Sequence, residues 1–125
     1  MYVVVVYNSL SEYREHQLCQ LTGDNFNYDI RYLYKDVKNY NSSFFLKNAK
    51  VWSTQSGAQR IVDDFLKDNE NSFTSSYFWL SDKFLAVKKL TIQEWYEICD
   101  EEAKKVKYEY ERKCRKIEQK RKSYK

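Results

Sequence analysis

A chain of 125 residues is long enough for one domain with a real core and too short for a second domain. Hydrophobic residues make up 42%, charged residues 32%, and the formal net charge is +4, as in folded soluble proteins. No run of about 18 apolar residues occurs, which excludes a membrane-spanning helix and predicts no membrane partner. Three cysteines, odd in number and without metal-ligand spacing, fit a reducing cytoplasm.

The first elements are expected to be three antiparallel strands. Residues 2–7 have the β-branched and aromatic composition of a strand buried on both faces. Residues 13–21 alternate in a way that favours a second strand, and the Thr-Gly-Asp-Asn sequence at 22–25 supplies turn chemistry. Residues 28–34 place Tyr28, Ile30, Tyr32 and Tyr34 on one face of a third strand.

The middle of the chain predicts a loop and then a helix. Residues 35–50 are polar and then apolar at Phe44-Phe45-Leu46, so we expect a loop, with or without a short strand before residues 51–52. Ser53, Thr54 and Ser56 are candidate caps for a helix that ends near Asp68. The apolar stripe of this helix contains Ala58, Ile61, Val62, Phe65 and Leu66. After a loop at 68–72, residues 77–80 and 84–90 are expected to form two further strands.

Residues 91–125 predict one long amphipathic helix. Thr91 and Glu94 form a capping box, Leu90 and Trp95 form the matching hydrophobic staple, and neither Gly nor Pro follows. Apolar residues recur close to a heptad spacing, apart from Lys113, at Ile92, Trp95, Cys99, Ala103, Val106, Tyr110 and Ile117. Thirty helical residues span about 45 Å, whereas a compact domain of this size has a radius of gyration of about 14 Å. We therefore expect the helix to overhang the body and to be buried against another copy, in a dimer or a higher homo-oligomer.

The fold class that follows is α+β in a single domain, residues 1–125. Residues 1–90 are expected to form an antiparallel sheet of four to five strands with one short helix. Residues 91–125 form the long helix, and its charge is uneven. Residues 91–102 carry five acids and no base, whereas residues 103–125 carry eleven Lys or Arg against three Glu. This end is either a solvated helix face or a binding surface for phosphates or nucleic acid.

Nothing in the sequence predicts catalysis, a cofactor or a metal. The single histidine, His16, has no partner at metal-ligand spacing, and a chain with two glycines cannot form a glycine-rich phosphate loop. Tyr77-Phe78-Trp79 presents aromatic rings, which are either covered by the helices or available to stack on a nucleobase. Arginine binds phosphate in a bidentate manner and stacks on purines. The candidate binding residues are therefore Phe78 or Trp79 for a base, Arg112 and Arg115 for a pyrophosphate, and Arg60 for a second anionic site.

The order of these elements resembles the first family of phage anti-Thoeris proteins. The resemblance rests on the N-terminal sheet, on the Val-Trp-Ser-Thr-Gln-Ser-Gly-Ala-Gln-Arg segment at 51–60, on Tyr-Phe-Trp-Leu at 77–80, and on the basic terminal helix. It implies an immune evasion protein in the host cytoplasm that binds cyclic ADP-ribose isomers without cleaving them, in pockets between protomers. Higher assemblies of that family also hold cyclic oligonucleotides.

Two other functions fit the same residues. An anti-CRISPR-like inhibitor would bind a host defence protein directly through the aromatic surface and the long helix. A small nucleic-acid-binding protein would use the basic half of that helix to contact phosphates, and its affinity would then fall steeply with salt.

Overall fold

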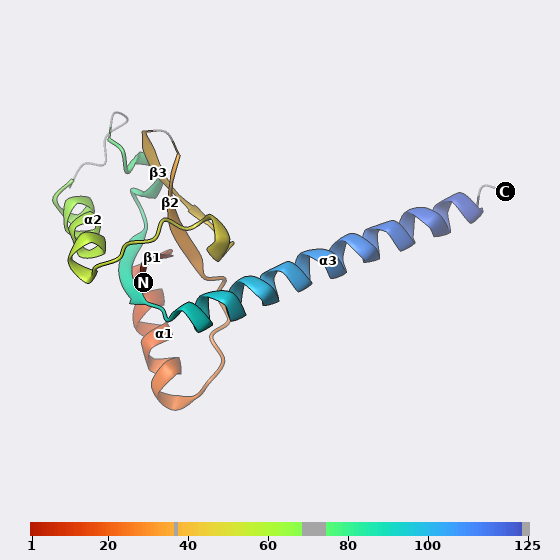
Figure 1. Ribbon diagram of the computed structural model, residues 1–125, viewed down its shortest axis with the longest axis horizontal. Coiled ribbons are helices and arrows are strands. Elements are labelled where there is room, and N and C mark those ends of the chain that lie inside the picture. Colours follow the sequence, from red (N-terminus) through yellow and green to blue (C-terminus); the bar gives the residue numbers. More distant parts are fainter. Residues whose placement is uncertain (37, 69–74, 124–125) are drawn as a thin grey trace.

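The computed structural model describes residues 1–36, 38–68 and 75–123, with side chains up to residue 116 in the last range. The fold is α+β, as the sequence predicts, with a four-stranded antiparallel sheet in the order β3-β2-β1-β4 (Figure 1). In chain order the elements are β1 (Tyr2–Tyr7), α1 (Leu10–Thr22), β2 (Arg31–Asp36), β3 (Asn39–Ser43), the 3-10 helix η1 (Leu46–Asn48), α2 (Gln55–Lys67), the 3-10 helix η2 (Phe78–Leu80), β4 (Phe84–Lys89) and α3 (Ile92–Ser123). None of the helices in these ranges combines the length and the apolar character needed to cross a membrane.

Strand β1 is one of the two inner strands of the sheet, and it confirms the prediction of a buried strand over residues 2–7. It pairs with β4 along all six residues and with β2 through Val5 and Val6. Val4 and Val6 point into a core shared with α2, whereas Val3 and Val5 point into a core shared with the start of α3. The four valines are at most 2% exposed, which is why this run is apolar on both faces.

One face of the sheet is covered by α2 and η2. Of the three predicted caps, Thr54 is the one that acts, and its hydroxyl accepts a hydrogen bond from the Gly57 amide at 3.2 Å. The predicted strand at 77–80 is wrong, because Phe78–Leu80 forms a 3-10 turn. Tyr77 and Leu80 are both buried, and residues three apart share one side of a 3-10 helix but opposite sides of a strand.

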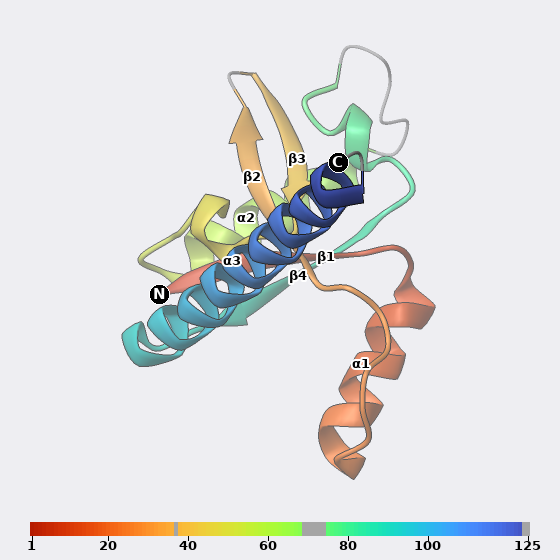
Figure 2. The same cartoon turned by 90° about the vertical axis from the view of Figure 1, so that its right-hand side faces the viewer.

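The predicted strand at 13–21 is also wrong, because this segment belongs to α1. Ser9 caps the helix by accepting from the Glu12 amide at 3.1 Å, and Gly23 ends it with φ +78°, a conformation that favours glycine. The helix buries only Glu12 and His16, and it points away from the rest of the chain (Figure 2). Its apolar residues are not its buried residues, so its sequence lacks the helical period of hydrophobicity.

The hairpin of β2 and β3 replaces the predicted third strand and loop. β2 begins at Arg31 instead of Tyr28, and β3 lies inside the segment expected to be a loop. Tyr2 also pairs with Trp52 in an isolated antiparallel bridge beyond the hairpin. The second strand of the hairpin, Asn39–Ser43, is mostly polar. Hydrophobic alternation in the sequence therefore does not indicate it.

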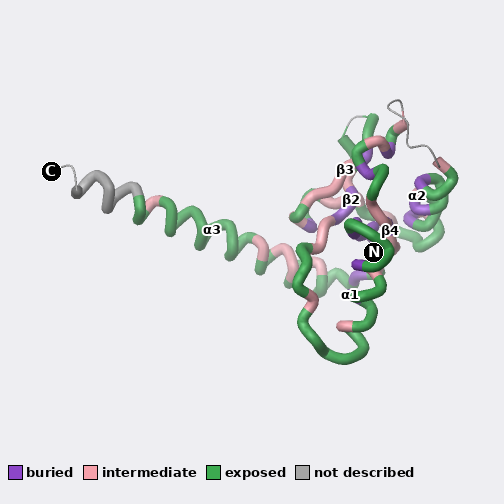
Figure 3. The backbone as a smooth tube through the Cα atoms, turned by 180° about the vertical axis from the view of Figure 1, so that it is seen from behind, coloured by how far each residue is buried: buried purple, intermediate pink, exposed green. Residues whose placement is uncertain are grey.

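Helix α3 begins as predicted. The Glu94 amide donates to the Thr91 hydroxyl, and the Thr91 amide donates to the Glu94 carboxylate, both at 3.1 Å. Trp95 and Ile98 pack on the second face of the sheet, and Glu102 is partly covered. Between residues 103 and 116, where the side chains are described, only Cys114 is partly covered. The remaining part of α3, residues 103–123, is called the overhang here, and it extends away from the sheet over about 30 Å (Figure 1). Most of its described side chains are exposed (Figure 3).

Candidate functional site

The two arginines predicted to bind a pyrophosphate lie together on the overhang. Arg112 and Arg115 are exposed and line one side of α3 about one turn apart. With their neighbours they form a shallow depression of about 150 Å³, called the arginine face here. Its lining residues are Tyr108, Glu111, Arg112, Arg115 and Lys116. This surface has the cationic groups and an aromatic ring, but it is smaller than the pockets of about 300–1,000 Å³ that enclose small ligands.

The other predicted binding residues lie far from the arginine face within one chain. Trp79 is 60% exposed on η2, and its ring meets that of half-buried Phe78 edge to face, with centroids 5.2 Å apart. Arg60 is exposed on α2. Both elements cover the sheet face opposite to the one from which α3 leaves (Figure 1). A single chain therefore does not bring Arg60, Phe78 and Trp79 to Arg112 and Arg115.

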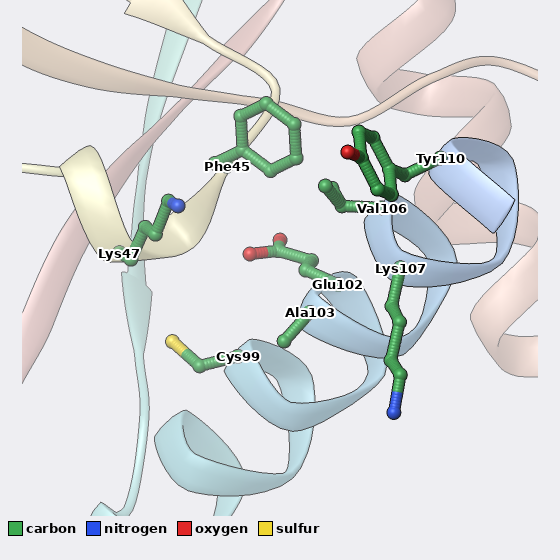
Figure 4. Close-up of a pocket in the computed structure, with 8 residues that line it drawn as sticks. All are labelled: Phe45, Lys47, Cys99, Glu102, Ala103, Val106, Lys107 and Tyr110. Carbon is green, nitrogen blue, oxygen red and sulfur yellow. The ribbon is translucent and has the colours of Figure 1, made fainter. Parts of the chain in front are cut away.

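A groove that the sequence did not predict lies where α3 leaves the body, and it is called the seam groove here. It has a volume of about 370 Å³, and Phe45 faces Val106 and Tyr110 across it (Figure 4). Its lining residues are Phe45, Lys47, Cys99, Glu102, Ala103, Val106, Lys107 and Tyr110. Phe45, Val106 and Tyr110 give the groove a largely apolar lining, so it suits a hydrophobic side chain better than a phosphate.

The carboxylate of Glu102 holds the two walls of this groove together. Both of its oxygens accept from the Leu46 amide, at 3.0 and 3.1 Å. Leu46 is fully buried, and Phe45 caps η1 without a side-chain hydrogen bond. Glu102 therefore satisfies a backbone donor at the start of η1 and fixes Phe45 relative to α3.

A second groove lies on the other flank of α3, and it is called the acidic groove here. Its volume is about 630 Å³, which is sufficient for a nucleotide. Aromatic rings line it, but so do four carboxylates against one lysine: Asp29, Glu101, Glu102 and Glu109, with Lys105. The larger cavity thus has the wrong charge for an anion. In the sequence, the apolar Phe44-Phe45-Leu46 run inside a polar segment marks one wall of these grooves, but nothing there shows that it meets α3.

His16 lies on α1 instead of on a strand, and it connects that helix to the sheet. Its Nδ1 atom is 2.7 Å from the Tyr7 hydroxyl oxygen, and its ring stacks on Phe26 with centroids 4.3 Å apart. Burial lowers the pKa of His16, and the nearby Lys88 lowers it further. Burial also raises the pKa of Tyr7 to about 12. These contacts are those of a buried structural histidine that is held neutral.

The cysteines do not form a reactive or metal-binding group within the described part of the chain. Cys19, Cys99 and Cys114 are free thiols and partly covered. Burial raises the pKa of Cys99, and the neighbouring Glu102 carboxylate raises it further. A thiol with a raised pKa is a weak nucleophile at neutral pH. Among the described residues, no three His, Cys, Asp or Glu side chains are grouped so that they could hold a metal ion.

Comparison of the chain with protein-family models, with curated proteins and with solved structures gave no match in any of the three. The fold itself defines the chain as an α+β domain with a projecting helix. The surfaces of that helix carry the candidate binding residues Arg112 and Arg115.

Proposed function

We propose that the protein is a non-enzymatic phage immune evasion protein that binds cyclic ADP-ribose-type nucleotides and sequesters them. The observation that carries this proposal is the arginine face, where Arg112 and Arg115 lie side by side next to the ring of Tyr108. Two guanidinium groups match a pyrophosphate, and a tyrosine ring can stack on a base. The nucleotide class itself comes from the resemblance to the anti-Thoeris family.

A single chain offers only one wall of such a site. The depression of about 150 Å³ is open to solvent, so a dinucleotide-sized ligand would keep most of its surface in water. A second wall must come from another copy. Arg60, Phe78 and Trp79 are the residues that we assign to that wall, because they are distant within the chain and chemically suited to a base and a phosphate. The proposed site is therefore one that forms between protomers of a homo-oligomer.

The proposal predicts that Arg112 and Arg115 supply most of the binding energy. A hydrogen bond to a charged group contributes about 1.5–3 kcal/mol, so the Arg112→Ala, Arg115→Ala double variant should bind cyclic ADP-ribose at least about a hundredfold more weakly. Isothermal titration calorimetry measures this affinity. The matched control removes two positive charges from exposed positions outside α3, at Lys38 and Lys89. Lysine at positions 112 and 115 should rescue binding only in part, because an ammonium group lacks the bidentate geometry.

The bound nucleotide should be released unchanged when the complex is heat-denatured and filtered. If linear ADP-ribose is recovered in proportion to the protein added, the protein is an enzyme and the proposal of sequestration without cleavage is wrong. Equal losses in the lysine control and in the arginine variant would show a general electrostatic surface. In that case binding to single-stranded DNA, with a steep dependence on salt, would identify a nucleic-acid-binding protein.

A further inference from the structure

Helix α3 carries a second apolar stripe that the body leaves uncovered. The stripe consists of Ile92, Tyr96, Cys99, Ala103, Val106 and Tyr110, and we call it the exposed seam. The spacing alternates strictly between four and three residues, which is the heptad pattern of helices that pair with another helix. Ile92, Tyr96 and Tyr110 are 65–68% exposed, and Val106 is 47% exposed. The sequence continues this spacing to Lys113 and Ile117, and the side chain of Ile117 lies outside the described residues.

The exposed seam is distinct from the face that packs on the sheet. Trp95 and Ile98 contact the core, and at about 100° per residue they lie on average about a quarter turn from the middle of the seam. Cys99 belongs to the edge of both surfaces, because it is a seam residue that also packs against the core. The seam therefore runs along the body-bound part of α3 as well as along the overhang. Apart from Cys99, the described residues of the seam stay exposed when one chain folds, so the stripe is available to another helix.

We propose that the exposed seam pairs with the α3 helix of a second copy in antiparallel orientation. The distribution of charge along α3 favours this occupant and this direction. Residues 91–102 carry five acids and no base, whereas residues 103–116 carry seven Lys or Arg and two Glu. A parallel pair would place the acids of one helix beside those of the other. An antiparallel pair places the acidic half of each helix beside the basic half of its partner.

The register follows from charge and from the heptad together. The acidic block is centred near residue 98, and the basic residues 104–116 are centred near residue 110. Matching these centres while keeping seam residues in contact places Ala103 opposite the partner's Val106, and Cys99 opposite the partner's Tyr110. Each layer then joins a small side chain to a larger one. Tyr96 lies opposite the partner's Lys113, whose methylene groups can cover the ring.

The seam groove provides the room for this partner. Cys99, Ala103, Val106 and Tyr110 are at once seam residues and lining residues of that groove, and Phe45 forms its other wall (Figure 4). A partner helix on the seam would fill the groove and bury Phe45 as well. Its overhang would lie beside this chain's body, and this chain's overhang beside the body of the partner.

This inference does not rest on the proposed ligand. Arg112 and Arg115 lie about 160° and 140° around the helix from Tyr110, so they face away from the seam. A paired α3 leaves the arginine face open to a ligand or to a further copy. Failure of nucleotide binding would therefore leave the pairing intact, and failure of pairing would show in the mass of the protein without any ligand.

The first test compares two tyrosines of equal exposure on opposite faces of α3. Tyr110 is 68% exposed on the seam, and Tyr108 is 67% exposed on the arginine face. Light scattering should give about twice 15.3 kDa, or a higher even multiple, for the unmodified chain. Tyr110→Glu should weaken association about tenfold or more, because it buries an unpaired carboxylate, whereas Tyr108→Glu should leave a mass of at least twice 15.3 kDa. A monomeric unmodified chain, or equal effects of both variants, would overturn the proposal.

The second test measures the direction of pairing by electron-spin distance measurement. The chain carries Cys19→Ser, Cys99→Ala and Cys114→Ser, and one spin label is attached to a cysteine at position 93 or at position 104. In the antiparallel register, labels at Gln93 are separated by about 35 Å along the helix, whereas labels at Lys104 are within about 25 Å. A parallel pair gives short distances for both labels, and that result would refute the antiparallel arrangement. Circular dichroism confirms that each labelled chain keeps its helix content.

Discussion

Glu102 is the residue whose removal should most directly weaken the contact between η1 and α3. Its two oxygens accept from the Leu46 amide at 3.0 and 3.1 Å, and no residue further along α3 contacts the core clusters among the described side chains. Glu102→Ala leaves the Leu46 amide, in a fully buried residue, without this acceptor. A hydrogen bond to a charged group contributes about 1.5–3 kcal/mol, and the partial exposure of Glu102 reduces this to about 1–2 kcal/mol.

A loss of 1–2 kcal/mol is measurable in a domain of this size. It should lower the midpoint of thermal unfolding by about 4–8 °C, or the urea midpoint by about 0.5–1 M. Glu102→Gln keeps an oxygen acceptor and loses only the charge, so it should cost about half as much. Circular dichroism at 222 nm follows both transitions.

The matched control is Glu101→Ala, which makes the same change one residue earlier on an exposed part of the helix. Both alanine variants gain the same small increment of helix propensity, so the difference between them reports the contact with Leu46. If the two variants unfold at the same midpoint, Glu102 does not hold η1 to α3. If Glu102→Gln is as damaging as Glu102→Ala, the charge and not the acceptor atom is responsible.

Two further predictions concern the ends of the helices and the dependence on pH. Thr91→Ala should destabilise the protein by about 1 kcal/mol through loss of the α3 cap, and Thr91→Ser should restore most of it in urea unfolding. Because the pKa of His16 is lowered in the folded chain, the unfolded chain binds more protons below about pH 6.5, so stability should fall as pH drops through that value and level off below the folded pKa. His16→Gln should abolish this slope in unfolding curves recorded between about pH 5 and 7, and an unchanged slope would assign the titration to another group.

The elements that the sequence predicts correctly are those with local signals at their ends or in their composition. β1 is a run of four valines, α2 has a Thr54 cap and an apolar stripe, and α3 has a complete capping box. For α3 the cap carries the prediction, because Ile92, Tyr96 and Tyr110 are apolar and exposed. In β1 and along the buried face of α2, in contrast, the residues that are apolar in sequence are also those that pack in the core. Local pattern and tertiary structure agree there, so the prediction succeeds.

The elements that were missed are those in which this agreement fails. In α1 the buried side chains are Glu12 and His16, whereas Leu18 and Leu21 are 60% and 86% exposed. The sequence features that mark the ends of α1 are instead its two caps, Ser9 and Gly23. In η2 the aromatic composition favours a strand, but the three-residue spacing of Tyr77 and Leu80 fixes a 3-10 turn.

The grooves beside α3 could not be predicted from the sequence, and the reason is different. Phe45 and Val106 are some sixty residues apart in the chain, and only the contact between η1 and α3 brings them together. The two predicted arginines, in contrast, are neighbours because they lie about one turn apart on one helix, which is a local relation. Proximity within a helix could be predicted, and proximity between elements could not.

The charge of the grooves connects the ligand surface with the pairing surface. A phosphate within about 6 Å of one carboxylate is repelled by roughly 2–3 kcal/mol at an effective dielectric constant of about 20, and Glu101, Glu102 and Glu109 all line the acidic groove. Under the proposed function, an anionic nucleotide would therefore avoid the larger cavity and bind the arginine face, where one carboxylate, Glu111, lies among three cationic side chains. The same acids attract a cationic helix, and the chain itself carries one in the second half of α3. The distribution of charge that excludes a nucleotide from the start of α3 is thus the one that favours the basic half of a second copy there.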